Sequence, residues 1–267
     1  MRRDAGALAA RIGTAAVLIA MLLAALFYLP RAGVAALMAL IVGIAGFEWA
    51  RLCGLGLTRA RAYTAGIVLA FLLVFALEFG RAVFLIASAF WIVAVPLWLW
   101  LGMKPQHSAV LSAAGFVVLV PPALAMVTLQ PQEALLVLGL VWIVDTAAYF
   151  AGRRWGRRRL APSISPGKTW EGAAGGLVGA AAYAMILSTL LAGVQGTLMA
   201  AFLGAAVLLV MVSIVGDLFE SAAKRQAGVK DSGAILPGHG GMLDRIDSAS
   251  ATLPVAALVV PLLKAPL

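Results

Sequence analysis

Residues 197–216 read TLMAAFLGAAVLLVMVSIVG, twenty positions without a charged side chain, and Asp217 follows directly. A helix of about 20 apolar residues is long enough to cross the roughly 30 Å hydrocarbon core of a bilayer. The run is continuously apolar rather than alternating, which argues against a strand of a membrane barrel. This stretch therefore predicts a transmembrane helix that carries an acidic residue at one end.

Similar stretches recur along the whole chain of 267 residues. Side chains are 63% hydrophobic and 12% charged, whereas a soluble domain is about half apolar and a quarter charged. We therefore predict an all-α polytopic membrane protein and exclude a soluble enzyme with one anchor, a disordered chain and a collagen-like repeat. The nine expected spans are about 13–29, 33–50, 63–79, 82–102, 109–128, 134–151, 173–193, 197–216 and 248–264.

The basic residues set the expected orientation. Of the 20 lysine and arginine residues, 17 fall in the N-terminal tail or in loops on the same side of the membrane. Arg31, Arg81 and Lys264 fall on the other side. Because cytoplasmic loops are enriched in lysine and arginine, we expect the N-terminus in the cytoplasm and the C-terminus outside. Topology and anionic lipids then account for the net charge of +9, and no nucleic-acid partner is expected.

The acidic residues are concentrated in the second half of the chain. Seven of the eleven lie between positions 145 and 247, within the last four spans or at their cytoplasmic ends. We therefore divide the chain into an N-terminal scaffold of about five spans, 1–130, and a C-terminal catalytic region of about four spans, 131–267. The catalytic region contains the cytoplasmic loops 152–172 and 217–247. One cysteine and two histidines exclude an internal disulfide and a histidine-rich metal site.

The stretch 217–247 holds the densest set of polar residues. If the eighth span continues beyond its apolar part, Asp217, Ser221 and Lys224 lie on one face of its helix. Asp244 and Asp247 share a face at the start of the ninth span, so the two helices would direct carboxylates at each other. The alternative is that these charges merely pair with one another in a surface loop, at little energetic gain.

Carboxylates beside several cations are typical of a magnesium–polyphosphate site. Hard divalent ions prefer carboxylate oxygens and complete their coordination with water and substrate phosphates. Asp217 and Asp244 could supply the carboxylates, and glycines nearby, including Gly240 and Gly241, would let backbone amides approach an anion. The neighbouring cations are Lys224, Arg225, Lys230 and Arg245.

A second polar stretch begins at Asp145, inside an apolar span, where a carboxylate needs a cation or a metal as partner. Gly-Lys-Thr at 167–169 resembles the end of a phosphate-binding loop, but Pro162 stands where that motif requires glycine, so we reject it. Ser165, Lys168 and Thr169 precede a helix start and could still bind an anion. The alternative is a helix cap with a lysine that reaches toward the interface.

Two further features concern packing. Gly172, Gly175, Gly176 and Gly179 form two overlapping GxxxG pairs, for which close helix packing is the default interpretation and a homodimer face the alternative. Glu48 and Glu78 lie near the ends of spans, and we interpret them as interfacial residues.

Three motifs together resemble the phosphatidate cytidylyltransferase (CDP-diacylglycerol synthase) family. The run S-x-x-K-R-x4-K-D-x-G-x2-L-P-x-H-G-G-x2-D-R-x-D, residues 221–247, is similar to the family signature. The elements D-T-x-A-Y-F-x-G-R from Asp145 and I-S-P-x-K-T-x-E-G from Ile164 are similar as well. The three motifs cover about 100 residues. Ala223 departs from the larger aliphatic residue usual in the family, which should affect helix packing rather than chemistry.

The resemblance implies that phosphatidate and CTP react with Mg²⁺ to give CDP-diacylglycerol and pyrophosphate, at the cytoplasmic face of a bacterial inner membrane. It implies that Asp217 and Asp244 hold metal, and it leaves a second cation open. The candidate catalytic residues are Asp217, Lys224, Arg225, Lys230, Asp231, His239, Asp244, Arg245 and Asp247. The candidate substrate-binding residues are Asp145, Ser165, Lys168, Thr169, Glu171, Ser221, Gly240 and Gly241.

Two alternatives belong to other functional classes. A secondary transporter or channel would use Asp145 and Asp217 as ion or proton sites. A related membrane enzyme, such as a polyprenol kinase or another lipid nucleotidyltransferase, would use the same polar residues on a lipid substrate with a different hydrophobic tail. The clustering of charges at one membrane face favours an enzyme over a carrier.

Overall fold

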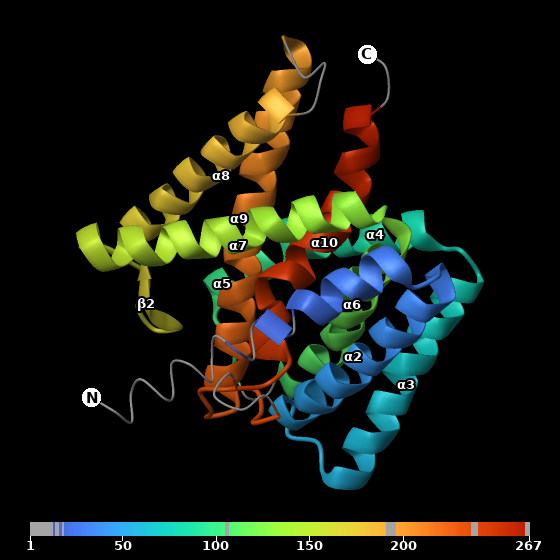
Figure 1. Ribbon diagram of the computed structural model, residues 1–267. Helices are drawn as coiled ribbons and strands as arrows, with labels where there is room; N and C mark the ends of the chain where they lie inside the picture. The colour runs from blue at the N-terminus through green and yellow to red at the C-terminus, as the bar shows by residue number, and fades with distance from the viewer. Residues whose placement is uncertain are drawn as a thin grey trace.

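The computed structural model describes residues 13, 16, 17, 19–104, 107–190, 196–235 and 240–264. Helices dominate it (Figure 1), which confirms the all-α class. The helices are α2 Arg31–Leu52, α3 Leu57–Ala76, α4 Gly80–Ala89, the π-helical turn η1 Phe90–Ala94, α5 Val95–Leu101, α6 Ser108–Thr128, α7 Pro131–Trp155, α8 Trp170–Leu190, α9 Thr197–Gln226 and α10 Leu243–Lys264. The predicted loop 152–172 contains a short antiparallel hairpin, β1 Arg159–Ala161 and β2 Ser165–Thr169, that we did not predict.

Within the described residues, eight helical segments are long and apolar enough to cross a membrane, counting α4, η1 and α5 as one. They correspond to the last eight predicted spans, so the chain is an integral membrane protein. The first predicted span, 13–29, lies partly outside the described residues, which include a shorter apolar helix at Ile19–Tyr28. The orientation of the N-terminus stays a prediction, as does the division into 1–130 and 131–267.

Two helices extend beyond their predicted apolar limits. The span predicted at 197–216 continues as helix α9 to Gln226, and the one predicted at 248–264 begins at Leu243 as α10. The predicted limits lie where each apolar stretch meets its first charged residues. The helices continue because those charges find partners on neighbouring segments, as described below.

An aromatic cluster anchors the polar end of α9 to the N-terminal half of the chain. The Phe219 ring is buried and lies 5.5 Å from the rings of both Trp91 and Trp98, and 6.1 Å from that of Trp49. The Trp49 indole N–H in turn donates to the Leu111 carbonyl at 2.9 Å. Helices α2, η1, α5 and α6 thus hold the segment of α9 that carries Asp217 and the residues after it.

Helix α8 packs closely against α7 through its glycines. A Cβ on Gly172 would lie 2.9 Å from the Ala148 carbonyl oxygen, and one on Gly179 would lie 2.8 Å from the Ala147 Cβ. One on Gly176 would lie 3.2 Å from a Val144 methyl group. The GxxxG pairs therefore serve close packing inside the chain, as predicted. In Figure 1, the end of α8 lies near the start of α9, the two helices diverge toward β2, and α7 crosses both.

We predict that Gly179→Val destabilises the protein by about 1–3 kcal/mol, because the added methyl groups overpack the α7–α8 contact. The melting temperature in detergent measures the effect. Gly204→Val is the matched control, since it makes the same change on α9 where a Cβ would meet no atom within 4 Å. Equal melting temperatures for the two variants would contradict this account of the glycines.

Candidate active site

A polar cavity of about 670 Å³ lies where α7 ends, α8 begins, and α9 meets the start of α10. It brings together residues from the two predicted polar stretches, which are far apart in the sequence. The predicted site residues in its wall are Asp145, Lys168, Thr169, Asp217, Asp244 and Asp247. Three further lining residues, Tyr149, Arg153 and Arg159, were not among the candidates. Four carboxylates and three cations therefore line one cavity.

Lys168 reaches this cavity from the hairpin. It lies on β2, just before α8, and its ammonium group forms an ion pair with the Asp217 carboxylate of α9. Both side chains are about one quarter exposed, at 24% and 27%, so the pair remains accessible from the cavity. The Ser221 hydroxyl, one helical turn further along α9, donates to Asp217 Oδ1 at 3.4 Å.

Asp244 and Lys224 join the ends of α9 and α10. The Lys224 Nζ lies 2.6 Å from Asp244 Oδ1 and 3.1 Å from Glu220 Oε1. All three side chains are nearly buried, with 11% of Lys224, 7% of Asp244 and 6% of Glu220 exposed. The expected meeting of the acidic ends of these two helices is therefore observed. Glu220 was not among the candidate residues, although its i,i+4 spacing from Lys224 is visible in the sequence.

The second oxygen of Asp244 holds the glycine-rich segment. Asp244 Oδ2 accepts hydrogen bonds from the Ser232 backbone N–H at 2.9 Å, the Ser232 hydroxyl at 3.0 Å and the Gly241 N–H at 2.9 Å. Gly240 has φ +78°, in the left-handed region that favours glycine. Both oxygens of Asp244 are thus engaged inside the protein, and a metal ion there would displace or share the Lys224 contact.

Glu48 is a buried part of this arrangement, so its interpretation as an interfacial residue was wrong. It is 6% exposed. Its carboxylate accepts from the Met242 and Leu243 backbone N–H groups, each at 3.0 Å, and from the Ser232 hydroxyl at 2.9 Å. Amides at the start of a helix have no acceptor within the helix itself, and a negative charge there is favourable. The signal available in the sequence was a carboxylate beside a tryptophan inside an apolar run.

Several candidates brace the site without lining the cavity. The Arg225 guanidinium donates to the Ile164 carbonyl at 3.3 Å and to the Val229 carbonyl at 3.2 Å, which ties α9 to the hairpin. The Glu171 carboxylate accepts from the Arg157 N–H at 3.0 Å and from the Arg158 N–H at 3.2 Å. These side chains support the turn that presents Lys168.

Thr169 and Ser165 lie at the two ends of β2, and Thr169 directly precedes α8. The Thr169 hydroxyl accepts from the Gly172 N–H at 3.0 Å, so it caps α8 as the alternative interpretation proposed, while also lining the cavity. Ser165 begins β2 opposite Ala161.

The remaining candidates lie elsewhere. Lys230 and Asp231 are exposed in the turn after α9. Arg245 is exposed and lines a smaller cavity of about 180 Å³ that also touches Asp145 and Asp247. His239 lies outside the described residues.

The donor set of the polar cavity suits a hard divalent cation. Across the described ranges, no three histidine, cysteine or acidic side chains lie close enough to enclose a metal ion by themselves. Magnesium is usually bound by one or two carboxylates together with water and substrate phosphates. Asp217 and Asp244, with Asp145 and Asp247 on the same wall, provide oxygen ligands of that kind.

Comparison with known proteins gives consistent matches. The chain matches the cytidylyltransferase family over residues 9–263. It is 39% identical to the phosphatidate cytidylyltransferase of Pseudomonas aeruginosa over 271 residues, which is 94% of this chain and 96% of that protein. The phosphatidate cytidylyltransferase of Thermotoga maritima is 44% identical over 135 residues, 49% of this chain and 50% of that protein. That of Haemophilus influenzae is 49% identical over 119 residues, 43% of this chain and 41% of that protein.

We predict that Glu48→Gln lowers the melting temperature in detergent, at a cost of about 1–3 kcal/mol, because the amide NH₂ group would face backbone donors. Glu78→Gln is the control. Glu78 is a span-end carboxylate whose side chain is 75% exposed and pairs with Arg31 at 3.4 Å, so the change should cost less than about 1 kcal/mol. A Glu48→Gln protein as stable as the control would show that this carboxylate does not hold α10.

Proposed function

Because the chain belongs to the cytidylyltransferase family, we propose that it transfers the cytidylyl group of CTP to phosphatidate. The products are CDP-diacylglycerol and pyrophosphate. Relatives named phosphatidate cytidylyltransferase support these two substrates. The observation that carries the proposal is the polar cavity, in which carboxylates and cations suited to a polyphosphate lie among helices apolar enough to cross a membrane. A lipid headgroup and a nucleotide triphosphate can meet in such a place.

The proposed reaction is an in-line displacement at phosphorus. A phosphate oxygen of phosphatidate attacks the α-phosphorus of CTP, a new P–O bond forms, and the bond to the bridging oxygen breaks. Pyrophosphate leaves with the bonding electrons. The second pKa of a phosphate monoester is about 6, so the nucleophile is already ionised and a strong general base is unnecessary. Positioning and electrostatic stabilisation then supply most of the rate enhancement.

We assign the cations of the cavity to the phosphate oxygens. Lys168, Arg153 and Arg159 line the cavity, and Lys168 is held in place by Asp217. The Arg153 guanidinium also donates to the Tyr149 hydroxyl at 2.9 Å, which orients it along α7. Arginines contact phosphate through two parallel hydrogen bonds, and lysine acts as a compact point charge. Lys224 is more enclosed, and its role is to hold Asp244.

We assign Asp217 and Asp244 as the residues that would hold Mg²⁺. Both line the cavity, and each forms an ion pair with a lysine. Bound Mg²⁺ would neutralise negative charge that develops on the departing pyrophosphate. Asp145 and Asp247 lie in the same wall and could bind waters of that ion or orient neighbouring groups.

We also propose that the cavity faces the cytoplasm of a bacterial cell, at the inner membrane. It lies at the end of α7 that continues into the arginine-rich segment 153–159, and such segments are typical of cytoplasmic loops. The charged groups gather at this one end of the helices. A carrier would be expected to place its ionisable groups near the middle of the bilayer, which makes the enzyme the better-supported function.

We predict that Asp217→Asn reduces product formation at least about 100-fold while the protein stays inserted and folded, because it removes a charged oxygen ligand from the reaction centre. The measurement uses radiolabelled CTP with phosphatidate in detergent, with and without Mg²⁺, and scores label that extracts with lipid.

Lys104→Ala is the control for this assay. Lys104 is exposed in the connection after α5, and its loss should leave activity unchanged. Activity of Asp217→Asn close to that of the unaltered protein would remove the proposed metal site. Absence of product from the well-folded unaltered protein would instead favour the transporter hypothesis.

A further inference from the structure

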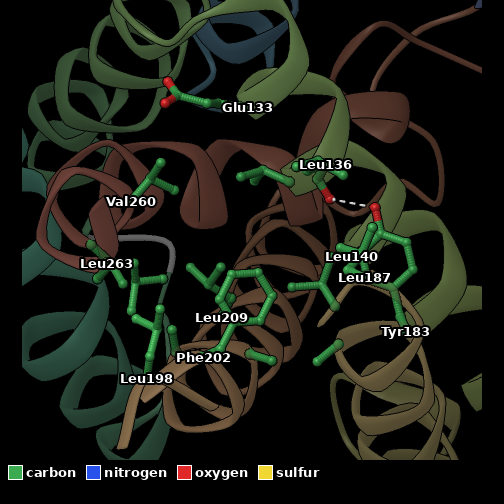
Figure 2. A pocket seen from close by; sticks show the side chains of 15 residues that line it. Glu133, Leu136, Leu140, Tyr183, Leu187, Leu198, Phe202, Leu209, Val260 and Leu263 are labelled. Carbon is green, nitrogen blue, oxygen red and sulfur yellow. Dashed lines mark hydrogen bonds between the residues drawn. The ribbon is translucent and has the colours of Figure 1, made fainter. Parts of the chain in front are cut away.

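A second cavity, of about 240 Å³, lies between α7, α8, α9 and α10 (Figure 2). It is lined by the first halves of α7 and α9, whereas the polar cavity is lined by their second halves. Leucines and Phe202 dominate its wall. Its two ionisable side chains are Tyr183, whose hydroxyl donates to the Leu136 carbonyl at 3.1 Å, and Glu133, which caps the start of α7. The interior therefore suits an apolar ligand.

The two cavities are lined by the same faces of α7 and α9. On α9, Phe202 and Leu209 line the apolar cavity, and Ser213 and Asp217 line the polar one, at spacings of seven, four and four residues. Such spacings keep side chains on one face of a helix. On α7 the corresponding residues are Val137, Leu140, Val144 and Ala148. We call these eight residues the lane; four of them line the apolar cavity and the other four line the polar cavity.

Ser213 stands at the boundary between the two parts of the lane. It is 2% exposed and lines the polar cavity, and its hydroxyl has no hydrogen-bond partner among the residues the structure describes. A buried hydroxyl without a partner is unfavourable, so it points to an acceptor on a ligand. One helical turn separates Ser213 from the charged Asp217 on one side and from the aliphatic Leu209 on the other.

We propose that the lane binds one acyl chain of the lipid substrate, with the Ser213 hydroxyl donating to the ester carbonyl. This inference rests on the proposed function. The order of chemistry along α9, from charged to hydroxyl to aliphatic, matches the order of phosphate, ester and alkyl chain in phosphatidate. The phosphate would lie near Lys168, the ester at Ser213, and the distal part of the chain in the apolar cavity, past Leu140 and Leu209.

The lane length predicts a dependence on chain length. The acyl chain begins at the ester beside Ser213, and along a helix at 1.5 Å per residue Leu209 lies about 6 Å and Ala205 about 12 Å beyond it. An extended chain covers about 1.2 Å per bond, the value for an extended backbone. An octanoyl chain, about 8 Å beyond its ester, would therefore end between Leu209 and Ala205, whereas an oleoyl chain, about 20 Å long, would extend past Ala205.

The test fills the apolar cavity and compares two substrates. Ala205 lines the cavity, and Ala205→Trp should raise the KM for dioleoyl-phosphatidate about tenfold, the effect of losing roughly two buried methylene groups. The KM for dioctanoyl-phosphatidate should change less than twofold. Val207→Trp is the matched control, because Val207 is 49% exposed on another face of α9 and should leave both values within twofold.

The outcomes separate this proposal from the proposed function. Turnover of the dioctanoyl substrate by Ala205→Trp shows that the variant is folded. An unchanged KM for the dioleoyl substrate, or an equal increase in KM for both substrates, would contradict the proposal that the lane binds an acyl chain. Failure of the unaltered protein to use either substrate would overturn the proposed function itself.

The ester contact has its own test, with an ether-linked dialkyl phosphatidate that lacks the carbonyl acceptor. Ser213→Ala should raise the KM for the ester-linked lipid about fivefold, the effect of one hydrogen bond, and leave that for the ether-linked lipid unchanged. An equal change for both lipids, or no change for either, would overturn the assignment of Ser213.

Discussion

Pairing of charges in a poorly hydrated place is the constraint on which the rest of the structure depends. Lys224, with 11% of its side chain exposed, lies between Asp244 and Glu220, and an isolated charge at such a position would be strongly unfavourable. The pairing can be satisfied only if the end of α9 meets the start of α10. Glu48 adds a third helix, because its carboxylate binds the first amides of α10 and the hydroxyl of Ser232, which also binds Asp244. Removing one partner of such a network leaves another charge buried and unpaired.

Apolar packing between the helices positions the charged side chains of this network. Phe219 lies one position before Glu220, and its contacts with Trp49, Trp91 and Trp98 fix the rotation of α9, so Asp217 and Ser213 face α7 and α8. The glycines of α8 bring that helix against α7, and the hairpin before α8 can then carry Lys168 to Asp217. Each carboxylate that we assign to metal binding thus has a lysine beside it. The site carries little net charge before substrates bind, which lowers the cost of keeping it among apolar helices.

How well the sequence predicts each part of this arrangement depends on how far apart the interacting residues lie along the chain. Hydropathy locates eight of the nine predicted spans in the described residues, because burial in lipid acts on every residue of a span. Local spacing predicts that Asp217, Ser221 and Lys224 share a face, and that α9 and α10 direct acids at each other. Glu48 was misassigned because its partners lie about 190 positions away, and no local pattern encodes that distance. Arg225 was a candidate catalytic residue and Glu171 a candidate substrate-binding residue, and in the structure both side chains bind backbone groups of the hairpin region. A motif does not distinguish a residue that contacts substrate from one that positions its neighbour.

The same reasoning explains why one face of α9 carries so much of the proposed chemistry. An enzyme that joins a nucleotide to a membrane lipid must bind a polyanion and an alkyl chain on one molecule, although the two require opposite surroundings. A helix that crosses the interface passes through both environments, and side chains at four-residue spacing sample them in order. On α9 that order is Leu209, Ser213 and Asp217. The Ser213 hydroxyl, between the aliphatic and the acidic residue, is buried and has no hydrogen-bond partner among the described residues. A hydroxyl costs less to bury than a charge and can bind an ester that an aliphatic side chain cannot. Its position between the two cavities is therefore the feature that links lipid recognition to the phosphate chemistry.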